Sequence, residues 1–169
     1  VGANSTTIRG NVIGRNAANT ANIPNGDGGY YGSGIDVRAG SGHMIGGTGA
    51  TDGNVIAGNS PYGIRVESVG APAATIEGNA IFGNTGLGID LGVNGVTAND
   101  GVLTGGRANQ YLDAPVLTTT TLSGSTLSVS GYVGSAPNQA AFANTRVEVF
   151  VSDDDSSGYG EGRTYLGFV

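Results

Sequence analysis

The chain has 169 residues, of which 33 are glycine and none is cysteine, and its net charge is −6. The glycine content disfavours long helices, the absence of cysteine excludes disulfides and thiolate metal sites, and the acidic balance argues against binding to nucleic acid, which needs a basic surface. Apolar runs stay well below the ~20 residues of a membrane span, so we expect no membrane insertion of this segment. Because the chain begins at Val1 without an initiator methionine, we expect a piece of a longer or processed protein.

A seven-residue motif recurs three times in the first part of the chain. The copies are GNVIGRN at 10–16, GNVIAGN at 53–59 and GNAIFGN at 78–84. Each is preceded by a short apolar segment (TTIRG, HMIGG or ATIEG) and followed by an apolar tetrad (GIDV, GIRV or GIDL). The last two copies start 25 residues apart (78 − 53), whereas the first carries turn-forming residues that predict an inserted loop at about 19–33.

Each repeat therefore predicts three short strands joined by Gly/Asn corners. One such unit cannot bury its apolar face alone, but stacked units can, as neighbouring coils of a parallel β-helix about 4.8 Å apart. Stacking predicts three inward isoleucine columns, with a further apolar column beside the third: Ile8, Ile45 and Ile76; Ile13, Ile56 and Ile81; Ile35, Ile64 and Ile89; Val37, Val66 and Leu91.

The corner asparagines fall into the same register. Asn tolerates the left-handed backbone of tight corners, and stacked amides can hydrogen-bond from coil to coil. We therefore predict two structural columns: Asn11, Asn54 and Asn79 in one, and Asn16, Asn59 and Asn84 in the other.

Charged residues lie between the inward residues of the tetrads. Stacking would order Asp36, Arg65 and Asp90 as acid, base and acid on the outer face, with Arg38 opposite Glu67. A solvated, salt-bridged surface explains this pattern, and a pair of carboxylates for polysaccharide cleavage is the functional alternative. The two aspartates would be about 10 Å apart, and the intervening arginine should lower the pKa of both, which disfavours a general acid.

The GNxIxGN…GIxV coils resemble the right-handed parallel β-helix repeats of bacterial secreted and cell-surface proteins. The segment 86–117 is similar to the one that closes such helices and leads into an immunoglobulin-like β-sandwich. The resemblance implies an all-β chain: a short right-handed parallel β-helix of about three coils at 1–106, then a partial antiparallel β-sandwich at 107–169. It also implies an extracellular or cell-surface location.

The second segment is rich in threonine, serine and valine and alternates with a period of two. It predicts four antiparallel strands at about 115–121, 126–134, 145–152 and 163–169. An immunoglobulin-like sandwich has about seven strands, so we expect either a reduced sandwich or a truncated one. Either would cover the end of the β-helix, which is otherwise an adhesive edge.

Ligand sites are predicted more weakly. A tyrosine pair in the inserted loop, Tyr30 and Tyr31, together with Tyr62, is a candidate contact for an extracellular glycan, with Asp36, Arg65 and Asp90 nearby; packing of the loop against the coils is the alternative. The lone His43 has no nearby second histidine or cysteine to form a zinc site, so we expect it to be a polar turn residue.

Calcium is the metal that the acidic loop after 152 favours, because clustered oxygen ligands suit Ca²⁺. The candidate ligands are Asp153, Asp154, Asp155 and Glu161, although their spacing differs from an EF-hand and a solvated hairpin loop is the alternative. Asn94, Asn99 and Asp100 form a second candidate set, with a series of Asx turns as the alternative.

The sequence thus predicts a non-enzymatic structural or adhesive module that is able to self-associate. The rival hypothesis is a carbohydrate-binding or polysaccharide-degrading β-helix protein of the lyase or hydrolase type. No cofactor other than Ca²⁺ is implied.

Overall fold

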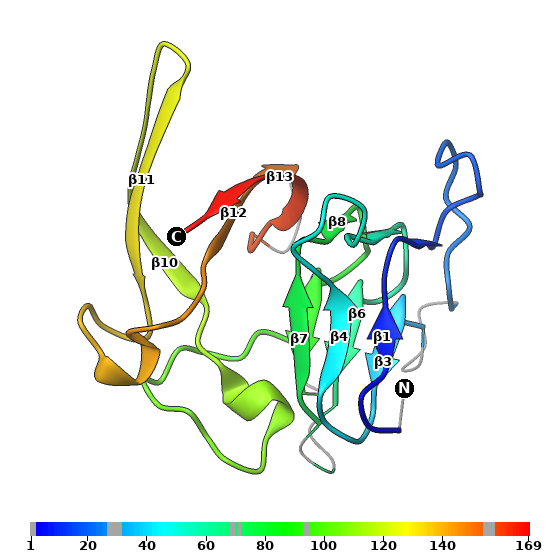
Figure 1. Ribbon diagram of the computed structural model, residues 1–169, viewed down its shortest axis with the longest axis horizontal. Helices are drawn as coiled ribbons and strands as arrows, with labels where there is room; N and C mark the ends of the chain where they lie inside the picture. The colour runs from blue at the N-terminus through cyan, green and yellow to red at the C-terminus, as the bar shows by residue number, and fades with distance from the viewer. Residues whose placement is uncertain (1–2, 27–31, 68–69, 71, 93–94, 154–157) are drawn as a thin grey trace.

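The computed structural model describes residues 3–26, 32–67, 70, 72–92, 95–153 and 158–169. The chain is all-β, with a stack of parallel strands followed by antiparallel hairpins (Figure 1). No helix among the described residues is long and apolar enough to cross a membrane.

Nine short strands build the first part of the molecule. They are β1 (Thr7–Ile8), β2 (Val12–Ile13), β3 (Ile35–Val37), β4 (His43–Gly46), β5 (Val55–Ala57), β6 (Ile64–Val66), β7 (Ala74–Glu77), β8 (Ala80–Phe82) and β9 (Ile89–Leu91). They form three parallel sheets in the orders β1-β4-β7, β2-β5-β8 and β3-β6-β9. Each coil contributes one strand to each sheet, so the chain circles three times as a short parallel β-helix.

The predicted apolar columns are confirmed in the register of the sheets. Ile8 pairs with Ile45 and Ile45 with Ile76, and the other two isoleucine columns align in the same way. The middle coil is the best buried, because it has a neighbour on both sides: Ile45, Ile56 and Ile64 are all 0% exposed. Burying each such side chain contributes roughly 1.5–3 kcal/mol, and this is the main source of stability in the stack.

The second part of the chain consists of two antiparallel hairpins. Its elements are the 3-10 segment η1 (Ala108–Tyr111), β10 (Pro115–Ser123), β11 (Thr126–Val133), η2 (Ala140–Phe142), β12 (Glu148–Asp153) and β13 (Glu161–Phe168). The four predicted strands are therefore present, as two separate two-stranded sheets, β10-β11 and β12-β13. The β12-β13 hairpin lies against the last coil through β8, while the β10-β11 hairpin projects away from the coils (Figure 1).

The inserted loop leaves the first coil earlier than predicted. Arg15 forms an antiparallel bridge with Asn22, and the Ile23 amide donates to the Gly14 carbonyl. Gly14 has a positive φ of 84° and turns the chain out of the coil directly after β2. The insertion therefore begins at Arg15 rather than near residue 19.

Candidate functional site: the charged face and the end of the stack

The first candidate site is the charged face formed by β3, β6 and β9. Sheet pairing places Asp36 beside Arg65 and Arg65 beside Asp90, as the repeat predicted. The Nε of Arg65 donates to Asp36 Oδ1 at 2.9 Å, and its Nη2 donates to Glu67 Oε1 at 2.6 Å. Arg38 Nε lies 3.4 Å from the same Glu67 oxygen.

The expected ion pairs are present and the Arg38 side chain is half exposed, but the expectation of a solvated face is wrong for two central residues. Arg65 is only 1% exposed and Asp90 is 0% exposed. The repeat identified which residues alternate with the apolar core positions, but not how deeply the folded chain buries them. Burial leaves Arg65 and Asp90 almost no surface for a glycan to contact, and glycan binding on this face stays a prediction.

Asp90 has an unusual environment for a carboxyl group. Neither of its carboxylate oxygens has a hydrogen-bond partner among the described residues. Burial raises the pKa of Asp90 from 3.8 to about 6, against the opposing attraction of the Arg65 guanidinium. Arg65 does lower the pKa of Asp90, as predicted, but the effect of burial, which the sequence did not show, is larger. Arg65 directs its short hydrogen bonds to Asp36 and Glu67, so it compensates Asp90 only through space.

The remaining predicted glycan contacts are not brought into one site. Tyr62 is half-buried beside Gly86, where a Cβ would lie 3.1 Å from its ring. Tyr30 and Tyr31 lie outside the described residues. His43, expected as a polar turn residue, instead begins β4, is 1% exposed, and has its Nε2 3.0 Å from the Ala39 carbonyl.

The first asparagine column runs through all three coils. Asn11 donates its backbone N–H and its Nδ2 to Asn54 Oδ1, each at 3.0 Å. Asn54 makes the same two bonds to Asn79 Oδ1, at 3.0 and 2.8 Å. Asn54 and Asn79 are buried, so these bonds satisfy backbone and side-chain groups that water cannot reach.

The second column differs from the prediction in its first member. Asn59 donates its N–H and Nδ2 to Asn84 Oδ1, but the residue that donates to Asn59 is Asn25, at 3.3 and 3.1 Å. Asn16 instead accepts from Thr20 within the inserted loop. In the second coil the left-handed glycine is Gly58, directly before Asn59, whereas in the first coil it is Gly14, two residues before Asn16. The chain turns too early for Asn16 to reach the column, and Asn25 takes its place when the loop returns.

The two predicted calcium ligands that the structure describes, Asp153 and Glu161, bond to other residues. Asp153 Oδ2 accepts from Arg163 Nη1 at 2.8 Å, and Glu161 is buried against Asn84. Asp154 and Asp155 lie outside the described residues. Within the described part of the chain, no group of three or more acidic, histidine or cysteine side chains is arranged to hold a metal. Calcium binding stays a prediction.

Two residues of the second predicted metal set form hydrogen bonds with the backbone. Asn99 exchanges two hydrogen bonds with the backbone of Ala114, and Asp100 Oδ1 accepts from the Val102 amide. Asn94 lies outside the described residues. The Asp100 contact is an Asx turn, as in the alternative interpretation, whereas Asn99 bridges to the segment before β10; a metal site here stays a prediction.

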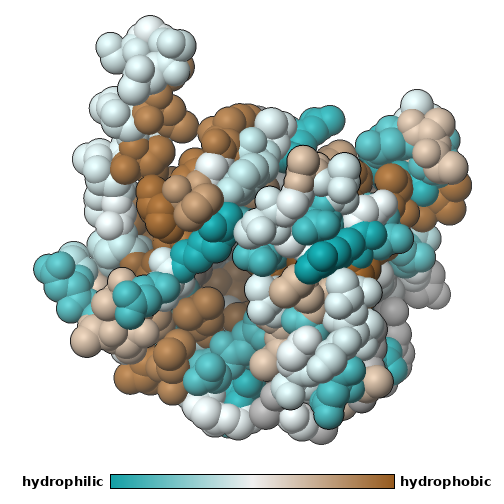
Figure 2. All heavy atoms as spheres, in the orientation of Figure 1, coloured by the Kyte–Doolittle hydropathy of each residue, from teal (hydrophilic) through white to brown (hydrophobic). Residues whose placement is uncertain are grey.

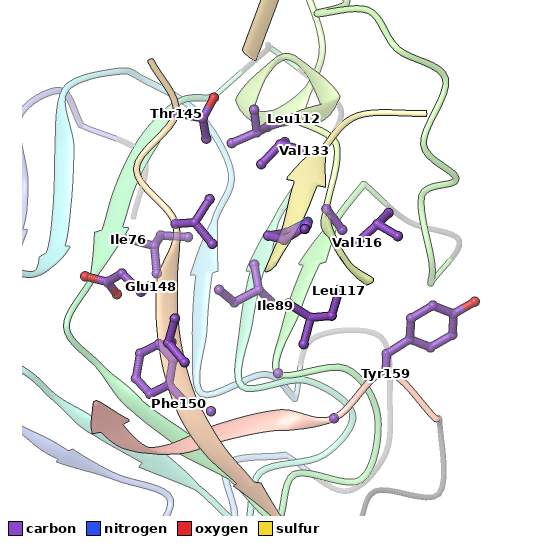
Figure 3. A pocket seen from close by; sticks show the side chains of 18 of the residues that line it. Ile76, Ile89, Leu112, Val116, Leu117, Val133, Thr145, Glu148, Phe150 and Tyr159 are labelled. Carbon is purple, nitrogen blue, oxygen red and sulfur yellow. The ribbon is translucent and has the colours of Figure 1, made fainter. Parts of the chain in front are cut away.

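The second candidate site is the end of the stack, which sequence reasoning did not identify as a site. A cavity of about 750 Å³ lies between the last coil and the two hairpins. Figure 3 shows Ile76 and Ile89 of the last coil around this space, with Leu117 and Phe150 from the hairpins. Ile89, the last member of its column, is 43% exposed, because the hairpins cover the end incompletely.

Two glutamates of the β12-β13 hairpin accept hydrogen bonds from backbone N–H groups at this end of the stack. Glu161 accepts from both the N–H and the Nδ2 of Asn84, at 3.0 and 2.7 Å. Glu148 Oε2 accepts from the Gly78 N–H at 2.8 Å. Strand alternation in the sequence does not show which donors these two glutamates meet once the hairpin packs on the last coil.

Comparison with known proteins adds no assignment. No protein-family model matches this sequence, and no solved structure matches it.

Proposed function

We propose that this chain is a non-enzymatic structural and adhesive module of a secreted or surface-displayed bacterial protein. The coil stack would act as a stiff element, and the C-terminal hairpins would supply the contact surface. The resemblance of the coils to β-helix repeats of such proteins supports the location, and the hairpins agree with an immunoglobulin-like sandwich in strand direction and alternation.

The observation that carries the proposal is the apolar surface of the hairpins. Leu122 is 72% exposed, Leu127 41% and Phe168 61%. Figure 2 shows apolar side chains gathered on the hairpin side of the molecule. Contiguous exposed apolar surface in a folded protein marks a site of interaction with another molecule.

The polar groups of the coils support a structural role for that part. The column asparagines bond from coil to coil, and Arg65 is bonded to Asp36 and Glu67. Side chains engaged in this way rigidify the stack and are held away from solvent, which fits a supporting element better than a catalytic one.

Adhesion of immobilised chain to protein-coated and glycan-coated surfaces tests the proposal. Leu122→Ser/Leu127→Ser removes a facing apolar pair near the hairpin tip and should reduce adhesion severalfold without changing the melting temperature. Thr121→Ala/Ser128→Ala is the matched control, because this neighbouring pair lies on the opposite face of the same hairpin.

Adhesion that is equal in wild type and in Leu122→Ser/Leu127→Ser would contradict the proposal. A reducing-end assay on acidic polysaccharides is run alongside. Release of sugar ends by wild type would replace the proposal with the enzymatic alternative.

A further inference from the structure

The carboxylate of Glu161 takes the position that an asparagine oxygen of a following coil would take. Between the second and third coils, the N–H and Nδ2 of Asn59 both donate to Asn84 Oδ1, at 2.9 and 3.0 Å. At the end of the stack the same two donors of Asn84 go to Glu161 Oε2 and Oε1. The hairpin thereby satisfies the buried donors of the last coil with a side chain from outside the repeat.

The same hairpin also closes the first corner. Glu148 lies on β12 and bonds the Gly78 amide, directly before Asn79 of the first column. Glu161 lies on the partner strand β13. Both glutamate contacts are therefore lost together if the hairpin moves away from the last coil.

The opposite end of the stack presents the complementary groups. Asn11 and Asn25 donate to the second coil, and within the described part of the chain their Oδ1 atoms accept no hydrogen bond. Strands β1, β2 and β3 are each the outer strand of their sheet. Because Asn11 and Asn25 stand directly over Asn54 and Asn59, their two oxygens have the spacing that the donors of a preceding coil require.

We propose that the β12-β13 hairpin is an internal cap that occupies the binding site for the first coil of a second copy of this chain. The second copy would offer Asn25 Oδ1 to the donors of Asn84 in place of Glu161, and Asn11 Oδ1 to Asn79, beside the Gly78 amide that Glu148 occupies. Its Ile8, Ile13 and Ile35 would continue the three isoleucine columns into the space that the hairpins leave unfilled next to Ile89. This inference rests on the proposed structural and adhesive function, and it adds the partner and the element that controls access to it.

The incomplete cover of the last coil supports a displaceable cap. The cavity of about 750 Å³ beneath the hairpins and the 43% exposure of Ile89 show that the cap satisfies hydrogen bonds better than it buries apolar surface. A stacked coil would do both, since it repeats the contacts that the second coil makes with the third.

Sedimentation velocity over a range of concentrations tests the proposal. Wild type should be mainly monomeric, and Glu148→Ala/Glu161→Ala should self-associate about tenfold or more tightly, since the cap loses its charge-assisted hydrogen bonds and competes less well. Asp153→Ala is the matched control: it lies on the same hairpin, faces Arg163 and should leave the chain monomeric.

The second half of the test identifies the surface that stacks. Adding Asn11→Ala/Asn25→Ala to the uncapped chain should abolish its self-association, while a mixture of this chain with wild type should still form heterodimers, because wild type retains the acceptor end. A folded uncapped chain that stays monomeric would overturn the proposal. Self-association that persists in the uncapped chain carrying Asn11→Ala/Asn25→Ala would also overturn it.

If Glu148→Ala/Glu161→Ala fails to fold, Glu148→Gln/Glu161→Gln gives the same comparison while keeping the side-chain volume, and a folded, monomeric glutamine variant then counts against the proposal. These outcomes are separable from those of the adhesion test. Leu122→Ser/Leu127→Ser should leave stacking unchanged, and the uncapped chain should still adhere.

Discussion

Replacing Asp90 by asparagine should change the stability of the protein in a pH-dependent way, with the variant gaining on wild type as the pH rises from acid to neutral. Asp90 is fully buried, its oxygens lack hydrogen-bond partners within the described part of the chain, and burial raises its pKa to about 6. In the folded state the carboxyl therefore holds its proton at a higher pH than in the unfolded chain. Ionising it inside the protein is unfavourable, and asparagine is nearly isosteric but cannot ionise.

The shift sets both the size of the effect and the pH window. A rise from 3.8 to about 6 is roughly two pKa units, or about 3 kcal/mol at about 1.36 kcal/mol per unit. Because the folded pKa is the higher one, the contribution of Asp90 to stability is fully present below pH 3.8 and is lost as the pH rises through about 6. The introduced amide of the Asp90→Asn variant is itself unsatisfied at every pH, so only the pH dependence of the difference is diagnostic.

Chemical denaturation of wild type and Asp90→Asn between about pH 4 and about pH 7 measures this difference. The unfolding free energy of Asp90→Asn minus that of wild type should increase by about 2–3 kcal/mol across the interval. Asp153→Asn is the control, because Asp153 forms an exposed pair with Arg163 and should give a change below about 1 kcal/mol. A difference that stays constant with pH would refute the argument from burial.

Three further predictions concern stability and can be measured by the same unfolding experiment. Arg65→Ala should lower the free energy of unfolding by about 3–5 kcal/mol, because it leaves Asp36 and Glu67 without their buried partner. Arg38→Ala removes a half-exposed side chain and should lower it by less than about 1 kcal/mol. Equal losses would contradict the central role of Arg65 in these ion pairs. Asn59→Ala should lower the free energy of unfolding by about 2–4 kcal/mol, and Asn16→Ala should lower it by less than about 1 kcal/mol. The reverse order would indicate that Asn16 belongs to the second asparagine column after all. Gly63→Ala should lose about 1–3 kcal/mol, because the added Cβ would lie 2.6 Å from the Gly88 carbonyl oxygen and 2.7 Å from Ile81 Cγ2; a neutral change would show that the coils can separate to accept it.

The coil stack could be predicted because the same residue pattern occurs in each of the three coils. A residue pattern that recurs at one spacing allows a single register, and that register alone places Ile45 over Ile76 and Arg65 beside Asp90. The prediction failed for Asn16, where the repeat itself is irregular. The order Gly-Arg-Asn in place of Gly-Asn was the available signal that the chain leaves the coil there.

Burial of the charged face and capping of the last coil could not be predicted in the same way. Alternation tells which way Asp90 points, but its pKa depends on how completely the folded chain buries it. Likewise, Glu148 and Glu161 have no local feature that distinguishes them from solvated acids in a hairpin. Their role appears only when the hairpin is docked on Gly78 and Asn84.

The asparagine columns also give the stack an electrical direction. In the second column the amides of Asn25, Asn59 and Asn84 all donate the same way, so their dipoles add along the axis with the positive end at Asn84. A carboxylate at that end is stabilised as an anion is at the N-terminus of an α-helix, by aligned N–H groups that no further residue satisfies. The negative charge of Glu161, and not only its shape, therefore suits its position at the end of the third coil, where the row of dipoles stops.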